Sequence, residues 1–330
     1  MDCNIVLIAD RVEDFSDITI GNKDLECIPT KYFEQIYNGL LAVTRSVIHY
    51  NSPEEFCRNI EKHKNDIIVS IWSGQGSRFR KSLVPSICEA NNICYVGADP
   101  YVHFISQDKD ITKYVCAQYG INSAKGVLYE KEADIDRIYS LKLPIVVKPN
   151  CEGGSIGISN SNLKYDYKSA ISLARKLWTT FKLPVLLEEY IEGKEISVSM
   201  IGNRNHIDVI EASQLVIGDK EYFENELYGY EPKVNEPQNR HFLSATGLLS
   251  NDLKKKFQTL FHSLGKVELM RIDGRLNKDN EFTLIELTPD AYLGKRGSTT
   301  FCLNNIGYTY ENMLERLLVN AYDDYRRGRK

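Results

Sequence analysis

The chain of 330 residues contains no apolar run of about eighteen residues or more, so the sequence predicts no transmembrane helix. It begins without the basic segment of a signal peptide, and the apolar run at residues 5–8 is only as long as a strand. Its 8 cysteines include no Cys-x-x-Cys pair and no Cys/His cluster, which argues against zinc and for mostly buried thiols in a reducing compartment. Together these features predict a cytoplasmic protein with no membrane partner.

A broad basic stripe interleaved with aromatic residues is also missing, and the formal net charge is −4. Nucleic acid is therefore not an expected partner. The composition is ordinary for a globular protein, with 42% hydrophobic and 26% charged residues. The length suffices for roughly two or three domains, each with its own core.

The first hundred residues alternate predicted strands with predicted helices. Strand patterns at 4–9, 46–50, 66–72 and 93–97 are separated by helix patterns at 32–41, 53–64 and 82–90. This order predicts a parallel α/β sheet, in which the loops at the carboxyl ends of the strands line the binding crevice. The loop at residues 73–81 is therefore expected at that crevice.

The remaining residues predict two further units of mixed strands and helices. The first has strands at 126–129, 145–148 and 185–190 and a helix at 167–181; the second has strands at 195–202, 207–211, 268–275 and 281–287 and helices at 252–264 and from 310 onward. A polar stretch at 218–240 cannot bury a core and predicts a long loop. The predicted fold class is α/β, with domains at residues 1–104, 105–190 and 191–330.

The stretch at residues 143–159 is a candidate phosphate site. A short apolar strand ends on Lys148 and is followed by the glycine-rich segment 153–157. A lysine supplies a point charge, and glycines let backbone N–H groups approach anionic oxygens closely. A glycine-rich hairpin turn beside a surface lysine explains the same pattern, and these residues alone do not decide between the two.

Two carboxylates, Asp273 and Glu286, lie on adjacent strands of one predicted hairpin, whose turn is at residues 277–280. Counting outward from the turn places them within about two residues of direct pairing, so both can reach one cation. Paired oxygen ligands beside a phosphate site suit Mg²⁺. A strand face with two solvated acids is the alternative, but their apolar neighbours and the nearby Arg271 favour a site.

A second acidic cluster, Glu188, Glu189 and Glu195, lies where a predicted strand passes into a connection between units. An edge strand here could offer backbone N–H and C=O groups to a purine, with Glu188 accepting a hydrogen bond from the purine amino group. From the residues alone, a polar linker is the simpler explanation.

Taken in order, these motifs resemble those of ATP-grasp ligases, and within that superfamily the D-alanine–D-alanine ligase family. The resemblance covers nearly the whole chain; its motifs lie at 66–71 with the loop that follows, 93–97, 108–113, 147–159, 188–195, 228–233, 271–273 and 286–318. It implies an N-terminal parallel α/β domain followed by the two-lobed ATP-grasp fold, which is α+β. It also makes a homodimer an expected assembly.

The resemblance implies that ATP is held by a defined set of residues. Lys109 and Lys148 would hold the phosphates, and Ser155 in the glycine-rich loop would donate to the β- and γ-phosphates. Glu188 and the backbone that follows it would bind adenine, and Glu195 the ribose hydroxyls. The implied nucleotide-binding residues are Lys109, Lys148, Gly153, Gly154, Ser155, Ile156, Glu188, Glu189, Tyr190, Ile191, Glu195 and Lys233.

For the reaction itself, the resemblance implies that Arg271, Lys233 and Ser155 are catalytic. Arg271 would stabilise the tetrahedral intermediate, and Lys233, on the long polar loop, would contact the transferred phosphoryl group. The implied metal ligands, for one or two Mg²⁺ ions, are Asp273, Glu286 and Thr288.

The implied reaction is an ADP-forming ligation of a carboxylate to an amine, which would give an amide or a dipeptide. The γ-phosphoryl group moves to the carboxylate, an amine attacks the acyl phosphate, and phosphate leaves. The alternatives are acyl activation onto a thiol or a carrier protein, and a nucleotide-binding protein without ligase activity. The expected partners are a small-molecule acid and amine, with a carrier protein left open.

Several positions depart from the family's pattern. Thr288 replaces an asparagine, which leaves the second Mg²⁺ ion open, Val234 replaces a tyrosine, and Gly154 replaces a serine. The N-terminal Gly-Gly-x-Ser-x-Glu motif is missing, and residues 76–80 replace the family's Gly-Glu-Asp-Gly loop. Nucleotide chemistry is thus retained while the amino-acid pocket is changed, which predicts a product other than D-alanyl-D-alanine.

Cations near the expected crevice raise a further hypothesis. The loop carries Arg78, Arg80 and Lys81, and the acceptor region carries Lys295 and Arg296. These side chains suggest an anionic group on a substrate. Ordinary solvated charges explain them equally well.

Overall fold

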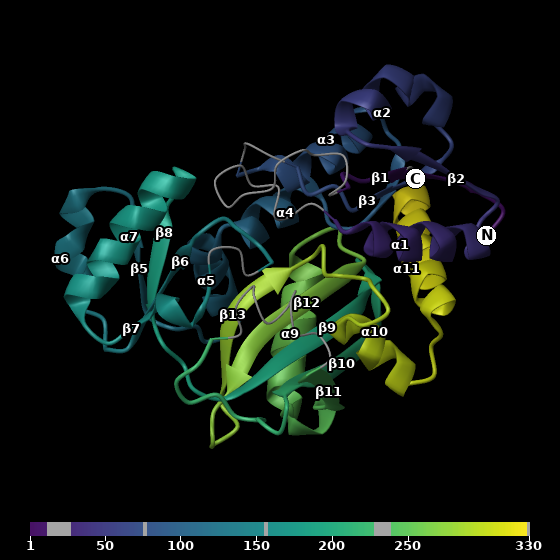
Figure 1. Cartoon of the computed structure of the whole chain (residues 1–330). Helices are drawn as coiled ribbons and strands as arrows, with labels where there is room; N and C mark the ends of the chain where they lie inside the picture. The colour runs from purple at the N-terminus through teal and green to yellow at the C-terminus, as the bar shows by residue number, and fades with distance from the viewer. Residues whose placement is uncertain (12–27, 75–77, 155–157, 228–238, 329–330) are drawn as a thin grey trace.

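The computed structural model describes residues 1–11, 28–74, 78–154, 158–227 and 239–328. Three sheets organise them (Figure 1), a parallel one near the N-terminus and two antiparallel ones. Seven cysteines lie in the described ranges, and none of these seven forms a disulfide. Within the same ranges, no helix is long and apolar enough to cross a membrane.

The N-terminal sheet is parallel throughout, in the strand order β2-β1-β3-β4, as the alternation of strands and helices predicted. Its strands are β1 (Asn4–Ile8), β2 (Ser46–Tyr50), β3 (Ile67–Ser70) and β4 (Cys94–Val96). Its helices are α1 (Thr30–Val43), α2 (Pro53–Asn59) and α3 (Leu83–Ala90), with 3₁₀ turns at Ile60–His63 and Arg80–Ser82. Ser52 caps α2 by accepting a hydrogen bond from the Glu55 N–H, as its sequence indicated.

The last helix of the chain, α11 (Tyr310–Arg327), packs against α1 and β4 and completes the N-terminal core. Its contact with α1 is close because Gly39 carries no side chain: an added Cβ would lie 2.6 Å from Leu314 Cδ1. Burial of each of the buried leucine side chains of α11 stabilises the folded state by about 1.5–3 kcal/mol. The proposed division at residue 104 therefore cuts through a core that both ends of the chain build.

The second sheet is antiparallel, in the order β5-β8-β6-β7. Its strands are β5 (Gly126–Tyr129), β6 (Ile145–Pro149), β7 (Leu163–Lys164) and β8 (Val185–Glu189). It is preceded by helices α4 (Pro100–Gln107) and α5 (Lys109–Ala117). Its own helix is α7 (Tyr167–Phe181), and there are short helical turns at Glu132–Asp134, Ile135–Ile138 (α6) and Asn160–Asn162. Helix α7 covers β6 and β8 with a stripe of apolar side chains at helical spacing. This unit lies to the left in Figure 1.

The third sheet is a five-stranded antiparallel sheet in the order β11-β10-β9-β12-β13. Its strands are β9 (Lys194–Asn203), β10 (His206–Ile217), β11 (Arg240–Ser244), β12 (Leu269–Leu276) and β13 (Phe282–Thr288); its helices are α9 (Asn251–Ser263) and α10 (Ser298–Asn305), with a 3₁₀ turn at Thr246–Leu248. Strand alternation divides the faces of β9 and β12: one face packs against α9, and the other carries polar side chains.

The sequence placed the long helices and most strands correctly, but it missed α4, α6, β7, α10 and β11 and ended β10 too early. Helix α10 begins after Gly297 with serine and two threonines, residues that favour caps and strands over helix interiors. Tertiary packing outweighs that local preference, because Thr299 and Thr300 are buried.

Candidate active site

The two carboxylates singled out in the sequence are direct cross-strand partners. Asp273 of β12 pairs with Glu286 of β13, and the register shifts by one residue between Asp273 and Gly274, which marks a β-bulge at Ile285 of β13. Two residues along, Arg271 pairs with Thr288, so all four side chains project from one face of the sheet. The predicted pairing is confirmed. Because a bulge adds one residue to one of the two strands, counting outward from the turn could place the partners only to within about two residues.

Asp273 is held from three sides. The Arg271 guanidinium donates from Nε to both carboxylate oxygens at 2.9 Å and from Nη2 to Oδ2 at 2.7 Å. Ser197 of β9 donates from Oγ to Oδ1 at 2.6 Å, and the Thr288 hydroxyl lies 3.5 Å from Oδ2. Burial works against the charge of Arg271, but Asp273 outweighs it and raises the pKa of Arg271. The carboxylate is thus fully oriented.

Glu286 faces a lysine from another part of the chain. The Lys109 Nζ, at the start of α5, lies 3.5 Å from Glu286 Oε2 and donates to the Glu152 carbonyl oxygen at 2.6 Å. Lys109 is buried, while Glu286 is half-buried. The predicted phosphate lysine therefore lies next to the predicted metal ligand.

The donor set fits Mg²⁺. Asp273, Glu286 and Thr288 offer oxygen atoms only, which is what a hard cation prefers. Within the described ranges no cluster of three or more His, Cys, Asp or Glu side chains could hold a metal ion. A cation here would have two carboxylates, and Mg²⁺ accepts that number when phosphate oxygens and water complete its coordination.

The predicted adenine residue Glu188 is buried between two lysines. Its carboxylate accepts from Lys148 of β6 through one oxygen and from Lys113 of α5 through the other. Burial by itself would raise the pKa of Glu188, but Lys148 and Lys113 outweigh it and lower the pKa to about 2. Burial lowers the pKa of Lys148, an effect that Glu188 opposes. Both Glu188 oxygens are thus engaged, and its contact with a purine stays a prediction.

The connection between β8 and β9 is anchored by an arginine that the sequence did not single out. Arg275 of β12 is buried; it donates to the Tyr190 hydroxyl at 2.7 Å and to the Ile191 carbonyl at 2.6 Å. It also lies 3.3 Å from a Glu195 carboxylate oxygen. The predicted ribose ligand Glu195 is therefore oriented by Arg275. The side chain of Glu189 accepts from the Lys142 N–H, on the other side of this connection.

The glycine-rich segment is only partly described. Gly154 has φ = +63°, a conformation that glycine adopts without strain, and an added Cβ would meet open space. Gly153 precedes it directly after Glu152. The predicted residues Ser155, Ile156 and Lys233 lie outside the described residues, and so does Val234.

Two of the crevice cations do not suit the anionic-substrate hypothesis. Arg80 forms an ion pair with Glu152 at 3.0 Å, and Lys81 forms one with Asp290 at 2.7 Å. The charges of Arg80 and Lys81 are thus compensated by carboxylates of the protein itself. Arg78 lies over the Phe79 ring. The sequence could not foresee these pairs because the partner carboxylates lie in other units of the chain.

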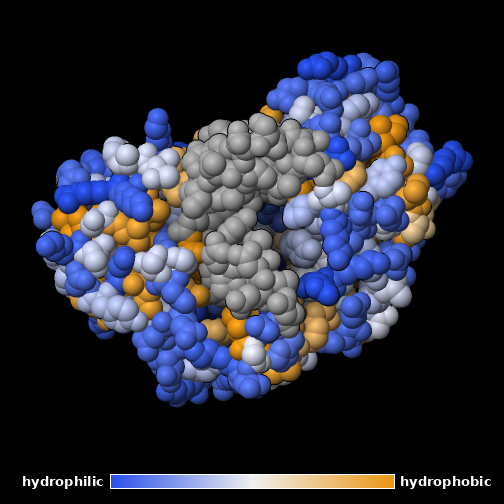
Figure 2. Space-filling view, in the orientation of Figure 1, coloured by the Kyte–Doolittle hydropathy of each residue, from blue (hydrophilic) through white to orange (hydrophobic). Residues whose placement is uncertain are grey.

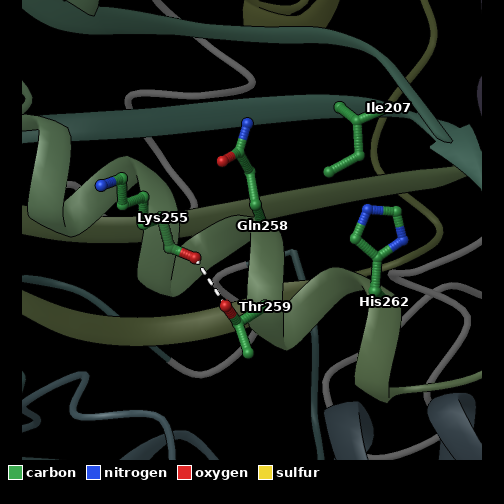
Figure 3. Close-up of a pocket in the computed structure, with 5 residues that line it drawn as sticks. All are labelled: Ile207, Lys255, Gln258, Thr259 and His262. Atoms are coloured by element: carbon green, nitrogen blue, oxygen red, sulfur yellow. Dashed lines mark hydrogen bonds between the residues drawn. The ribbon is translucent and has the colours of Figure 1, made fainter.

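Figure 2 shows a largely hydrophilic described surface with scattered apolar patches. A surface hollow lies between β10 and α9, lined by Ile207, Lys255, Gln258, Thr259 and His262 (Figure 3). Helix α9 covers the face of the sheet opposite to Asp273, so this hollow is not part of the candidate site. Its one internal hydrogen bond runs from the Thr259 hydroxyl to the Lys255 carbonyl within the helix.

A buried histidine near the Lys81–Asp290 pair predicts a pH dependence of stability. Burial lowers the pKa of His103 to about 4, although Asp290 opposes this; Lys81, Asp99 and Lys266 also act on the ring. The imidazole of His103 takes up a proton near pH 6.5 in the unfolded chain but only near pH 4 in the folded chain, so protonation favours the unfolded state. The full stability of the folded state is therefore present above pH 6.5 and is lost as the pH falls. Between pH 7.5 and pH 5, this one residue should lower the free energy of unfolding by about 2 kcal/mol.

Urea unfolding at the two pH values measures this effect. His103→Gln should reduce the difference between them, whereas His262→Gln, at an exposed position, should leave it unchanged. An unaltered difference in His103→Gln would refute the assignment.

Comparison with known proteins identifies the family. The family model described as "D-ala D-ala ligase C-terminus" matches residues 115–319. The chain belongs to the D-alanine–D-alanine ligase family. This membership makes it an ATP-dependent carboxylate–amine ligase by class, as the sequence predicted.

The relatives are distant but extensive. The D-alanine–D-alanine ligase of Actinobacillus succinogenes is 24% identical over 258 residues, which cover 76% of this chain and 79% of the relative. That of Geobacillus thermodenitrificans is 27% identical over 276 residues, covering 79% and 71%. At this identity the ligase class carries over, whereas each substrate pocket must be judged from its own residues.

Solved structures agree on the fold. The D-alanine–D-alanine ligase from Bacillus anthracis matches with a TM-score of 0.72 at 17% identity, over 99% of both chains. The VanG D-Ala:D-Ser ligase from Enterococcus faecalis matches with a TM-score of 0.70 at 16% identity, over 97% of this chain and 100% of the other. The predicted fold, a parallel α/β domain followed by the ATP-grasp lobes, is confirmed.

Proposed function

We propose that this ligase activates a small carboxylic acid as an acyl phosphate, using ATP and Mg²⁺, and joins it to the amine of an amino acid. The observation that carries the proposal is the direct pairing of Asp273 with Glu286, next to Arg271 and Lys109. These four groups provide two oxygen ligands and two cations at one place. Phosphoryl transfer needs little more than such positioning and charge neutralisation.

The nucleotide would lie between the antiparallel sheets. Lys148 and Lys109 are the proposed phosphate contacts, and the connection at Tyr190 and Ile191 is the proposed adenine edge. The proposed role of Glu188 is to fix Lys148 and Lys113, because its carboxylate already binds both. Bound at Asp273 and Glu286, Mg²⁺ would neutralise charge on the transferred phosphoryl group.

Arg271 is the proposed stabiliser of the second step. It lies two residues from Asp273 on the same strand face, with its side chain 19% exposed toward the candidate site. Preorganised cations next to a developing oxyanion are worth several kcal/mol in a site that excludes water. In this proposal Arg271 would donate to the oxyanion of the tetrahedral intermediate.

The substrates are proposed to differ from two molecules of D-alanine. The relatives are named for D-alanine or for D-alanine and D-serine. Here the loop after β3 and the loop after β13 are joined by the Lys81–Asp290 ion pair. Because the charges of that pair compensate each other, the proposal of different substrates rests on the sequence: residues 76–80 replace the family's Gly-Glu-Asp-Gly loop, and the N-terminal Gly-Gly-x-Ser-x-Glu motif is missing.

The test incubates the protein with ATP, Mg²⁺ and pools of acids and amines. Release of ADP and phosphate is expected, together with transfer of one ¹⁸O atom from a labelled carboxylate to phosphate, which reports the acyl phosphate. Release of AMP and pyrophosphate would refute the proposal. Release of ADP that depends on a thiol would instead support acyl activation onto a thiol or carrier protein, and ATP binding without turnover on any pool would support a non-catalytic nucleotide-binding role.

A further inference from the structure

A buried ion pair joins the N-terminal sheet to the segment that follows Lys148. Arg80 begins the 3₁₀ turn after β3, and Glu152 follows β6, 72 residues later. Both side chains are only 1% exposed, and Arg80 Nη2 lies 3.0 Å from Glu152 Oε2. A buried ion pair contributes little net stability compared with apolar residues of similar size. Its main effect is therefore to fix the position of the two segments that it joins.

The N-terminal end of this connection is itself rigid. Arg80 Nε donates to the Ser73 carbonyl at 3.0 Å, so the planar guanidinium is held in two directions. The Asp10 carboxylate, after β1, accepts from the Ser73 N–H at 2.8 Å and the Gly74 N–H at 2.9 Å. The position of Arg80 is therefore fixed by the carboxyl ends of two neighbouring strands.

The other end leads into the candidate nucleotide site. The Glu152 carbonyl accepts from Lys109 Nζ at 2.6 Å, and Lys109 lies beside Glu286. Asn150 accepts from the Asp110 N–H at 3.0 Å and donates to Asp108 at 2.8 Å. The segment 150–152 is thus held by α5 on one side and by Arg80 on the other, immediately before Gly153 and Gly154.

We propose that Arg80 is a positioning residue for nucleotide binding: through its ion pair with Glu152, the N-terminal domain fixes the 150–154 segment and orients Lys109. Arg80 acts through Glu152 and does not touch the nucleotide. The inference rests on the proposed nucleotide role of Lys109 and this segment. It adds that the domain lining the substrate crevice also sets the affinity for ATP.

Calorimetry with ATP and Mg²⁺ tests the inference without knowledge of the acid or the amine. Arg80→Met is expected to raise the Kd for ATP by about tenfold or more. Arg80→Lys, which keeps the charge but loses the planar fork, should recover part of the affinity. The matched control is Arg175→Met, because the Arg175–Glu132 pair lies exposed on the lobe that carries Glu152. The Kd of Arg175→Met for ATP should equal that of the wild type.

A second variant separates positioning from folding. Arg80→Met alone leaves the Glu152 charge buried without Arg80, whereas the double variant Arg80→Met/Glu152→Gln removes both charges. The double variant should recover a Tm close to that of the wild type and still bind ATP about tenfold more weakly. A double variant that binds ATP within about twofold of the wild type would overturn the inference alone. A wild-type protein that binds no ATP would overturn the proposed function as well.

Discussion

Asp273→Asn is expected to lower the rate of ligation by about 10²–10³-fold or more while the fold is retained. The substitution removes one of the two carboxylates proposed to hold Mg²⁺ and, with it, the negative charge that faces Arg271. An asparagine side chain can still accept from Ser197, whose hydroxyl donates to Asp273 at 2.6 Å. The fold should therefore be retained, and the loss of rate should not result from unfolding.

Asp279→Asn provides the control for this substitution. Asp279 lies in the exposed turn of the same hairpin, away from the paired carboxylates, and its rate should match that of the wild type. The measurement is the initial rate of ADP release, with circular dichroism to verify the fold. A rate for Asp273→Asn within about tenfold of the wild type would exclude Asp273 as an essential metal ligand.

Glu188→Gln is expected to destabilise the protein by about 3–5 kcal/mol, the largest stability effect expected here. The change leaves Lys113 and Lys148 buried together without their shared carboxylate. ATP binding should weaken as well, because the two lysines lose the group that fixes them. Urea unfolding at pH 7.5 measures the first effect and calorimetry the second.

The acid sensitivity of Glu188 follows from its pKa of about 2, which lies below the ordinary value near 4.3. Its stabilising contribution is present above pH 4.3 and is lost as the pH falls toward 2. Glu188→Gln should therefore lose less stability over this range than the wild type. Glu132→Gln is the matched control for the destabilisation measured at pH 7.5, because its exposed pair with Arg175 in the same lobe should matter little for stability there. Equal acid sensitivity of Glu188→Gln and the wild type would contradict the assignment.

Local patterns were enough to predict much of the fold. The alternation of strands and helices in the first hundred residues predicted the parallel sheet, and a hairpin turn predicted the pairing of Asp273 with Glu286. Helix α7 was predicted at its observed bounds because its apolar side chains recur at helical spacing. Such features depend on neighbours within about ten residues, which the sequence displays directly.

The environment of Glu188 was not accessible in this way. The sequence marked Glu188 as an acid next to a linker, and only the family resemblance made it a nucleotide residue. The structure shows that its two partners come from a helix 75 residues and a strand 40 residues earlier in the chain. No local pattern encodes a contact over such separations, since it forms only when the sheet and the helix pack together.

The sequence by itself determined the resemblance to the ligase family, the parallel N-terminal sheet, and the hairpin that pairs the two carboxylates. Only the tertiary structure decided that α11 completes the N-terminal core, that Arg80 and Lys81 are paired with Glu152 and Asp290, and that Arg275 orients Glu195. The physical reason is that strand pairing across a short turn follows from chain connectivity and side-chain alternation. A buried ion pair follows from which distant surfaces are brought together, and its partners appear only in the folded chain.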